Sequence, residues 1–233
     1  MFKGLRPAIA MIELIFSIVI MGIVMMSAPM LISTSTQSTY VSLQQEGINE
    51  ASSRVLMVMG YAWDEENAKQ EDNDTATILH TTSLTADLQS VGTTKRRVGI
   101  PMRSSRSYVD DNGKEFNASI ALGSEGGDSD DIDDYGGTTV VPIETAAVDY
   151  VEKQGKINIS TIVSYGADSV PGGYSQTTIT YVPFAAATST TSNIKNITVT
   201  VTDNSGVSDL AKNIVLQAFS CNIGAYSLQE RDF

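Results

Sequence analysis

The chain has 233 residues, of which 42% are hydrophobic and 18% are charged, and its net charge is −12. This excess of acids disfavours nucleic acid and anionic lipid as partners of the chain as a whole, and the single cysteine, Cys221, excludes an intrachain disulfide. The sequence holds one histidine and neither a nucleophile–base motif nor a phosphate-binding loop, so we predict that the protein is not an enzyme.

Residues 8–32 form an apolar stretch whose only charged residue is Glu13. A helix of this length, rising ~1.5 Å per residue, crosses a hydrocarbon core of ~30 Å. Lys3 and Arg6 precede the stretch and no basic residue follows until Arg54, so we expect a cytoplasmic N-terminus and an exported remainder. A secretory signal peptide is the alternative, but it has a shorter apolar region without an acid. A carboxylate in an apolar helix costs on the order of 2–3 kcal/mol at the bilayer centre, so Glu13 should have a use.

The N-terminal order is Lys3-Gly4, then IAMIELI over residues 9–15, then a long apolar run. This order resembles the N-terminus of type IV prepilins and type II secretion pseudopilins. In that family a prepilin peptidase removes a short basic leader, and the fifth residue after the cut is a glutamate. The resemblance implies a leader of residues 1–8, a cut between Ala8 and Ile9, and methylation of the new N-terminus. Ala8 and Ile9 stand where the family usually has Gly and Phe.

The resemblance also implies a location and partners. Family members are single-pass proteins of the bacterial inner membrane, with a cytoplasmic N-terminus and a C-terminal domain in the periplasm or in an extracellular filament. They polymerise through the apolar helix on an inner-membrane assembly platform. The family pairs the glutamate, here Glu13, with the N-terminal amine of a neighbouring pilin or pseudopilin subunit, here that of Ile9. Gly22 and Pro29 fall close to the family's helix-loosening glycine and proline.

After residue 33, apolar residues recur at spacings of three, four and seven, which is typical of one face of an amphipathic helix. The recurring residues are Val41, Ile48, Ala51, Val55, Val58 and Ala62. We predict one long helix over residues 9–63, membrane-spanning over about 9–32 and amphipathic over 33–63, with bends at Gly22 and Pro29. Residues 33–38, rich in Ser and Thr, are expected to be frayed and solvated.

Residues 64–74 read as a polar acidic linker, and the remainder of the chain is rich in β-branched and aromatic residues. The expected strands are 116–122, 138–143, 157–165, 177–184, 194–202 and 214–221, with a turn at 203–206. The predicted fold class is therefore α+β: a long N-terminal helix packed on an antiparallel β-sheet, with residues 64–233 as the exported globular domain. The resemblance implies the same architecture.

The segment 123–137 gathers carboxylates on a glycine-rich loop, and such clusters suit Ca²⁺, which takes six to eight oxygen ligands. The candidate ligands are Asp128, Asp130, Asp131, Asp133 and Asp134. Some major pseudopilins bind calcium in a loop of the soluble domain, so the resemblance makes calcium a candidate cofactor. The spacing lacks the glycine and the distal glutamate of an EF-hand, and acidic glycine-rich loops are usually only solvated, so a solvated loop without a cofactor is favoured.

Basic residues concentrate over 95–106, where Lys95, Arg96, Arg97, Arg103 and Arg106 fall. Such a patch fits nucleic acid, but Tyr108 is the only nearby aromatic residue and the surrounding charge is acidic, so pairing with acids is favoured.

Four Asn-x-Ser/Thr triplets begin at Asn73, Asn117, Asn158 and Asn196. At Asn73 and Asn117 an acid lies two positions upstream, which resembles the extended acceptor of bacterial oligosaccharyltransferases. In a chain rich in Ser and Thr such triplets arise easily without modification, so an unmodified chain is favoured over glycosylation at Asn73 and Asn117.

Three functional hypotheses fit these features. The missing disulfide favours a type II secretion pseudopilin. The basic cluster and the acidic loop favour a minor pilin for adhesion, priming or DNA uptake. The third is a membrane-anchored exported binding domain that never polymerises, and Glu13 argues against it because a simple anchor has no use for a buried acid.

Overall fold

The structure is a computed structural model that describes residues 6–71, 76–101, 104, 106–124, 127–143, 155–203 and 213–225. It consists of two compact units, Met1–Gly47 and Ile48–Phe233. The first unit contains most of helix α1, and the second contains the end of α1 and all of the remaining elements.

Helix α1 (Arg6–Met59) is continuous over 54 residues, which confirms the long N-terminal helix. It runs through Gly22 and Pro29 without interruption. The segment 33–38, expected to be frayed, is helical as well. Its hydroxyl groups donate to carbonyls of the preceding turn, as Thr34 does to Met30 at 3.1 Å and Thr36 to Ser33 at 2.8 Å. These bonds satisfy the hydroxyls without breaking the helix.

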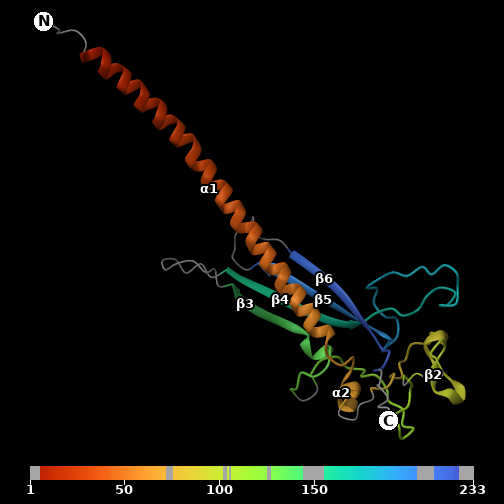
Figure 1. Cartoon of the computed structure of the whole chain (residues 1–233). Helices are drawn as coiled ribbons and strands as arrows, with labels where there is room; N and C mark the ends of the chain where they lie inside the picture. The colour runs from red at the N-terminus through yellow and green to blue at the C-terminus, as the bar shows by residue number, and fades with distance from the viewer. Residues whose placement is uncertain are drawn as a thin grey trace, which may run out of the picture. The chain divides into compact units, whose positions relative to one another are not determined.

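Four strands form one antiparallel sheet in the order β3-β4-β5-β6 (Figure 1). The strands are β3 (Gly137–Ile143), β4 (Gly155–Tyr165), β5 (Ile194–Asp203) and β6 (Asn213–Cys221). The sequence predicted all four from their content of β-branched and aromatic residues, and the alternation toward the end of β5 fits a strand with one buried face. Along β5 the alternate residues Ile197, Val199 and Val201 are buried.

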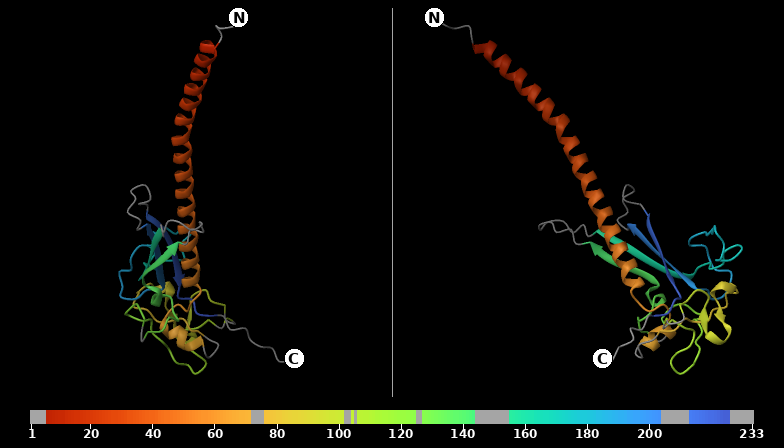
Figure 2. Two further views of the ribbon diagram at one scale, coloured as in Figure 1. Left: turned by 90° about the vertical axis from the view of Figure 1, so that its left-hand side faces the viewer. Right: turned by 45° about the vertical axis from the view of Figure 1, so that its right-hand side comes forward.

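The last turns of α1 pack on this sheet within the second unit, as the views in Figure 2 show. Ala51 and Val58 are fully buried in the same core as the inward residues of β4 and β5. Arg54 lies on the same part of the helix and donates to the Tyr135 carbonyl and to the Thr161 hydroxyl, each at 3.3 Å. The α+β architecture is therefore confirmed for this unit.

The expected acidic linker is instead a short helix, α2 (Glu65–Glu71). Asn67 and Gln70 are buried on it and bind the backbone of the next segment: Asn67 donates to the Thr77 carbonyl and Gln70 accepts from the Thr77 N–H, each at 2.9 Å. The linker prediction was wrong because polar composition does not exclude burial when side chains such as Asn67 and Gln70 find backbone partners.

Two expected strands, 116–122 and 177–184, are absent from the described residues. Ala118 donates to the His80 carbonyl and His80 to the Phe116 carbonyl, each at 2.8 Å, so the first segment makes only an isolated bridge. The second segment lies in the β4–β5 connection, where Val182 is 67% exposed. β-Branched residues favour strands only where a neighbouring strand exists to pair with them. Residues 204–206 of the expected turn lie outside the described residues.

The short elements gather at the end of the sheet where β4 ends and β5 begins (Figure 2). They include the two-residue strands β1 (Ser90–Val91) and β2 (Arg96–Arg97), and the 3-10 turns η1 (Ala86–Leu88), η2 (Gly92–Thr94) and η3 (Asp133–Tyr135). Arg97 holds the β1–β2 hairpin there, because it donates to Asn193 Oδ1 at 2.7 Å and to the Asn222 carbonyl at 2.8 Å.

Candidate functional site

The first half of α1 presents an apolar surface that the described residues leave uncovered. Its large apolar side chains between Met11 and Ile32 are 52–82% exposed. Helix α1 is long and apolar enough to cross a membrane. Each such side chain gains about 1.5–3 kcal/mol on transfer out of water, so an apolar environment around this surface would be favourable.

The sequence-predicted residues of the N-terminal segment all lie on this helix. Ala8 and Ile9 have helical backbone in its first turns, and Glu13 lies exposed one turn further on. A Cβ atom added at Gly22 would meet no atom within 4 Å, so this glycine leaves an open notch on the helix surface. Pro29 lies within the helix, where it withholds one backbone hydrogen bond.

The acidic loop is folded by its own carboxylates. Asp131 is buried and its Oδ1 accepts the backbone N–H of Asp133 at 2.8 Å and that of Asp134 at 3.2 Å. Asp134 Oδ2 accepts from the N–H groups of Asp130 and Asp131. These bonds form the turn η3 and engage two of the five predicted calcium ligands inside the protein.

Asp133, a third predicted ligand, faces a buried lysine. Its side chain and that of Lys195 are both fully buried, and Lys195 Nζ contacts Asp133 Oδ1 and lies 3.1 Å from Asp64 Oδ2. The ammonium group also lies over the Trp63 ring, 4.8 Å from its centroid, and 5.8 Å from that of Tyr165. Lysine is almost never fully buried without such partners.

Asp64 organises the junction between α1 and α2. Its Oδ1 accepts the Glu66 N–H at 3.3 Å, which caps the N-terminus of α2, and it accepts the Ser119 hydroxyl at 2.9 Å. The Ser119 N–H binds its Oδ2 at 3.1 Å. Asp64 therefore joins α2, the 116–122 segment and β5 through one side chain.

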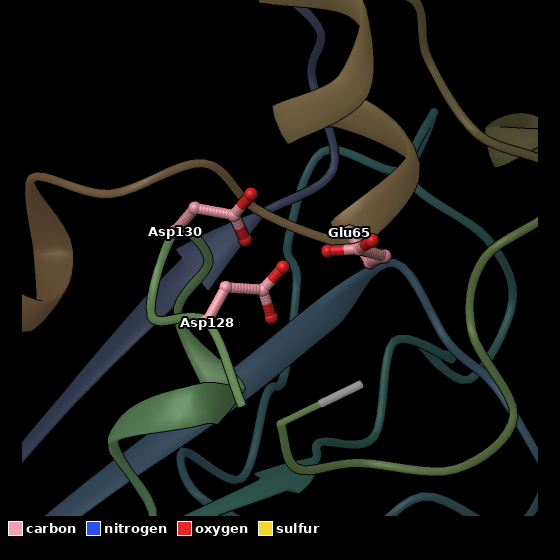
Figure 3. Close-up of side chains that lie close together, drawn as sticks. All are labelled: Glu65, Asp128 and Asp130. Atoms are coloured by element: carbon pink, nitrogen blue, oxygen red, sulfur yellow. The ribbon is translucent and has the colours of Figure 1, made fainter. Parts of the chain in front are cut away.

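Three carboxylates converge beside this junction, from Glu65 on α2 and from Asp128 and Asp130 on the acidic loop (Figure 3). One oxygen atom from each lies within 4.8 Å of the others. Glu65 is buried; its Oε1 lies 2.9 Å from Lys69 Nζ, while its buried Oε2 has no hydrogen-bond partner among the described residues. Burial raises the pKa of Asp130, and the charges of Glu65 and Asp128 raise it further.

This group fits a hard divalent cation. The three side chains offer up to six carboxylate oxygens, which suits Ca²⁺ when water completes the ligand shell. The structure thus brings two of the five sequence-predicted ligands together with Glu65, a residue that the sequence analysis did not include. Asp131, Asp133 and Asp134 are not in this group.

The remaining predicted sites are separated. Lys95 pairs with Glu115, whereas Arg97 binds within the protein, so these two residues are not part of a shared basic surface. Asn117 is exposed; Asn196 is buried in β5 and its amide donates to the Ala185 carbonyl at 3.3 Å. Asn73 and Arg103 lie outside the described residues.

A cavity of about 750 Å³ lies between the loops 82–87, 168–175 and 188–189. Its acids are engaged by the protein itself: Asp168 accepts from the Ser83 hydroxyl and the Asn193 amide, each at 2.7 Å, and Asp87 accepts the Tyr174 N–H at 2.7 Å. Because these carboxylates already accept hydrogen bonds from the protein, they stabilise the walls of the cavity and do not indicate a ligand site.

The sequence contained a signal for Lys195 that the strand prediction did not use. Lys195 lies an even number of residues from the buried Ile197, Val199 and Val201 along β5, so all four are on the same face of the sheet. Alternation alone therefore places the Lys195 side chain inside the unit. A charged residue at an inward position indicates a buried partner of opposite charge.

Comparison with protein-family models, curated proteins and solved structures gives no match for the chain.

Proposed function

We propose that this protein is a non-enzymatic structural subunit of a type II secretion or type IV pilus-like filament, anchored in a membrane by α1. One observation carries the proposal: a single helix has an exposed apolar first half containing Glu13, while its last turns belong to the core of a folded unit. A helix of this kind can pass from a lipid environment into a bundle of identical helices while its folded unit stays in water.

Glu13 would select the partner in that bundle. Removal of residues 1–8 creates an α-amino group on Ile9, and in a helix bundle this amine can pair with Glu13 of a neighbouring subunit. Opposite charges within ~4 Å attract strongly where water is scarce, and an unpaired buried carboxylate is penalised. Cleavage and assembly are then chemically linked.

The test exchanges Glu13 in the full-length chain. Glu13→Gln keeps the size and removes the charge, Glu13→Ala removes both, and Ser17→Ala one turn later serves as the matched control. We expect all three variants to insert and to be cleaved, and only the two Glu13 variants to fail in filament incorporation and in crosslinking between subunits. Normal assembly of Glu13→Ala would contradict the proposal and favour a simple anchor or a tip subunit.

Processing provides a second test. The membrane-extracted protein should begin at Ile9 and carry a methyl group on its nitrogen, as intact mass and N-terminal sequencing would report. A mature chain that begins at Met1, or one cut beyond Pro29 as by a signal peptidase, would overturn the filament function.

We also propose that Glu65, Asp128 and Asp130 bind Ca²⁺ and so fix the acidic loop to α2. The unpartnered Glu65 Oε2 favours this function. Calcium bound only to the folded state stabilises it by about 2.7 kcal/mol when its concentration is 100 times Kd.

Thermal unfolding of the full chain in detergent, with calcium against chelator, tests the cation site. We expect a saturable rise in Tm that Glu65→Gln abolishes. Glu66→Gln is the matched control, because Glu66 is the next residue on α2 and lies outside the three-carboxylate group. A Tm that does not change with calcium would refute the site. A calcium-dependent rise in Tm that remains in Glu65→Gln would refute it as well.

A further inference from the structure

Lys195 and Asp133 form a buried ion pair. Both side chains are fully buried, and Lys195 Nζ contacts Asp133 Oδ1 directly. The rings of Trp63 and Tyr165 lie close to the same nitrogen. An amine is therefore held against a carboxyl group in a site with little room for water, which is the arrangement in which proximity accelerates a reaction most strongly.

The two carboxylates beside Lys195 differ in how their charge is stabilised. Asp64 accepts from the Ser119 hydroxyl, the Ser119 N–H and the Glu66 N–H in addition to Lys195. Asp133 accepts only the Gly123 N–H, at 3.0 Å, besides Lys195 among the described residues. Asp133 therefore has fewer competing hydrogen-bond donors than Asp64, and its Oδ1 contacts Lys195 Nζ directly.

We propose that Lys195 and Asp133 become joined by an intramolecular amide bond after the chain folds. Lys195 Nζ passes one proton to the Asp133 carboxylate and attacks its Cγ atom. The Cγ–O bond to the protonated oxygen then breaks, and the hydroxyl leaves with a second Nζ proton as water. The third proton stays on the amide nitrogen, so atoms and charge balance and neither an oxidant nor a co-reactant is needed.

The same burial that holds the pair also favours the product. In bulk water an ionised amine and acid are strongly solvated and the amide is disfavoured. In a site without water the two ions lose that solvation, whereas the neutral amide does not require it. Exclusion of water also slows the reverse hydrolysis.

The bond would link η3 to β5 across 62 residues of the chain. It would fix the acidic loop to a central strand of the sheet independently of any bound ion. A subunit with this link would keep the loop in place when the ion is removed.

Peptide mapping of the folded, full-length protein tests the bond. After unfolding, trypsin cuts at Lys153 and Lys156 and so separates the two halves of the pair. We expect a branched peptide that contains residues 115–153 and 157–212, one water molecule lighter than the two sequences together, because an amide at Lys195 also blocks cleavage there. Fragmentation should place the branch at Asp133 and Lys195.

Two variants assign the bond. Asp133→Ala should remove the branched peptide and release the separate peptide 157–195, whereas Asp111→Ala, at an exposed acid of another loop, should keep the branch. Separate peptides at their sequence masses from the folded wild-type protein would overturn the proposal. A branch that carries residues 55–69, and so Asp64, would overturn the assignment to Asp133.

Discussion

At the residue scale, burial of the Asp131 carboxyl group destabilises its charged form. Burial raises the pKa of its carboxyl group from 3.8 to about 7; nearby Lys195 lowers this pKa and Asp133 raises it. Its Oδ2 is buried without a hydrogen-bond partner among the described residues. Between these two pH values the folded chain holds a proton that the unfolded chain has released.

This pKa predicts the pH dependence of stability. Because the folded state binds more protons between about pH 4 and pH 7, the free energy of unfolding should fall as pH rises through that window and level off above it. Asp131→Asn keeps the Oδ1 acceptor and cannot titrate. We expect it to remove this part of the slope and to exceed the wild type at pH 8 by up to about 4 kcal/mol.

Urea unfolding of both proteins from pH 4 to pH 8, with chelator present, measures the difference between the two curves. Parallel curves would show that Asp131 titrates normally in the folded chain.

Single residues differ in how far the sequence reveals them. Glu13 is visible at once, because one acid in an apolar stretch has no local explanation. Glu65 is not visible, since it lies in a run of acids and its burial depends on a loop 63 residues or more further along the chain, at Asp128 and Asp130. Sequence spacing indicates which residues share an element, whereas the approach of two loops depends on the completed fold.

At the element scale, α2 depends on its cap. Asp64→Ala removes the acceptor of the Glu66 N–H and the shared acceptor of the half-buried Ser119 N–H and hydroxyl. We expect a loss of about 2–3 kcal/mol in the free energy of unfolding. Asp64→Asn keeps Oδ1, so it should lose clearly less.

Urea unfolding of the two Asp64 variants at one pH measures this ordering. Equal losses would show that the cap contributes little and that the charge of Asp64 matters most.

Regular elements were the easiest to predict. Helix α1 and the four strands of the sheet have a strong period and residues that suit it, so local pattern and tertiary packing agree. The segments 116–122 and 177–184 have similar composition but no neighbouring strand among the described residues, and their backbone groups bond elsewhere or remain exposed. Helix α2 was missed because its capping residue and its buried amides look like those of a solvated linker.

At the scale of the whole molecule, the boundary between the two units falls within α1, after Gly47. Ala51 and Val58 belong to the core of the second unit. A fragment of residues 48–233 should therefore fold cooperatively, whereas a fragment of residues 61–233 should not. The shorter fragment loses Ala51, Val55 and Val58, worth about 5 kcal/mol of apolar burial, which is comparable to the whole stability of many domains.

Circular dichroism and thermal unfolding of the two fragments test this boundary. A cooperative transition in residues 61–233 would show that the sheet does not need the helix.

The contacts that close the second unit join distant parts of the chain: Asp64 meets Lys195 across 131 residues, and the Trp63 indole donates to the Ser220 carbonyl across 157. Such non-local pairing cannot form until the late strands exist, and it slows folding. In the proposed membrane-anchored precursor, α1 would enter the bilayer before β5 and β6 are synthesised. The exported part would then cross as an open chain that needs no unfolding. Its folding on the far side, complete only once β6 has emerged, would prevent its return.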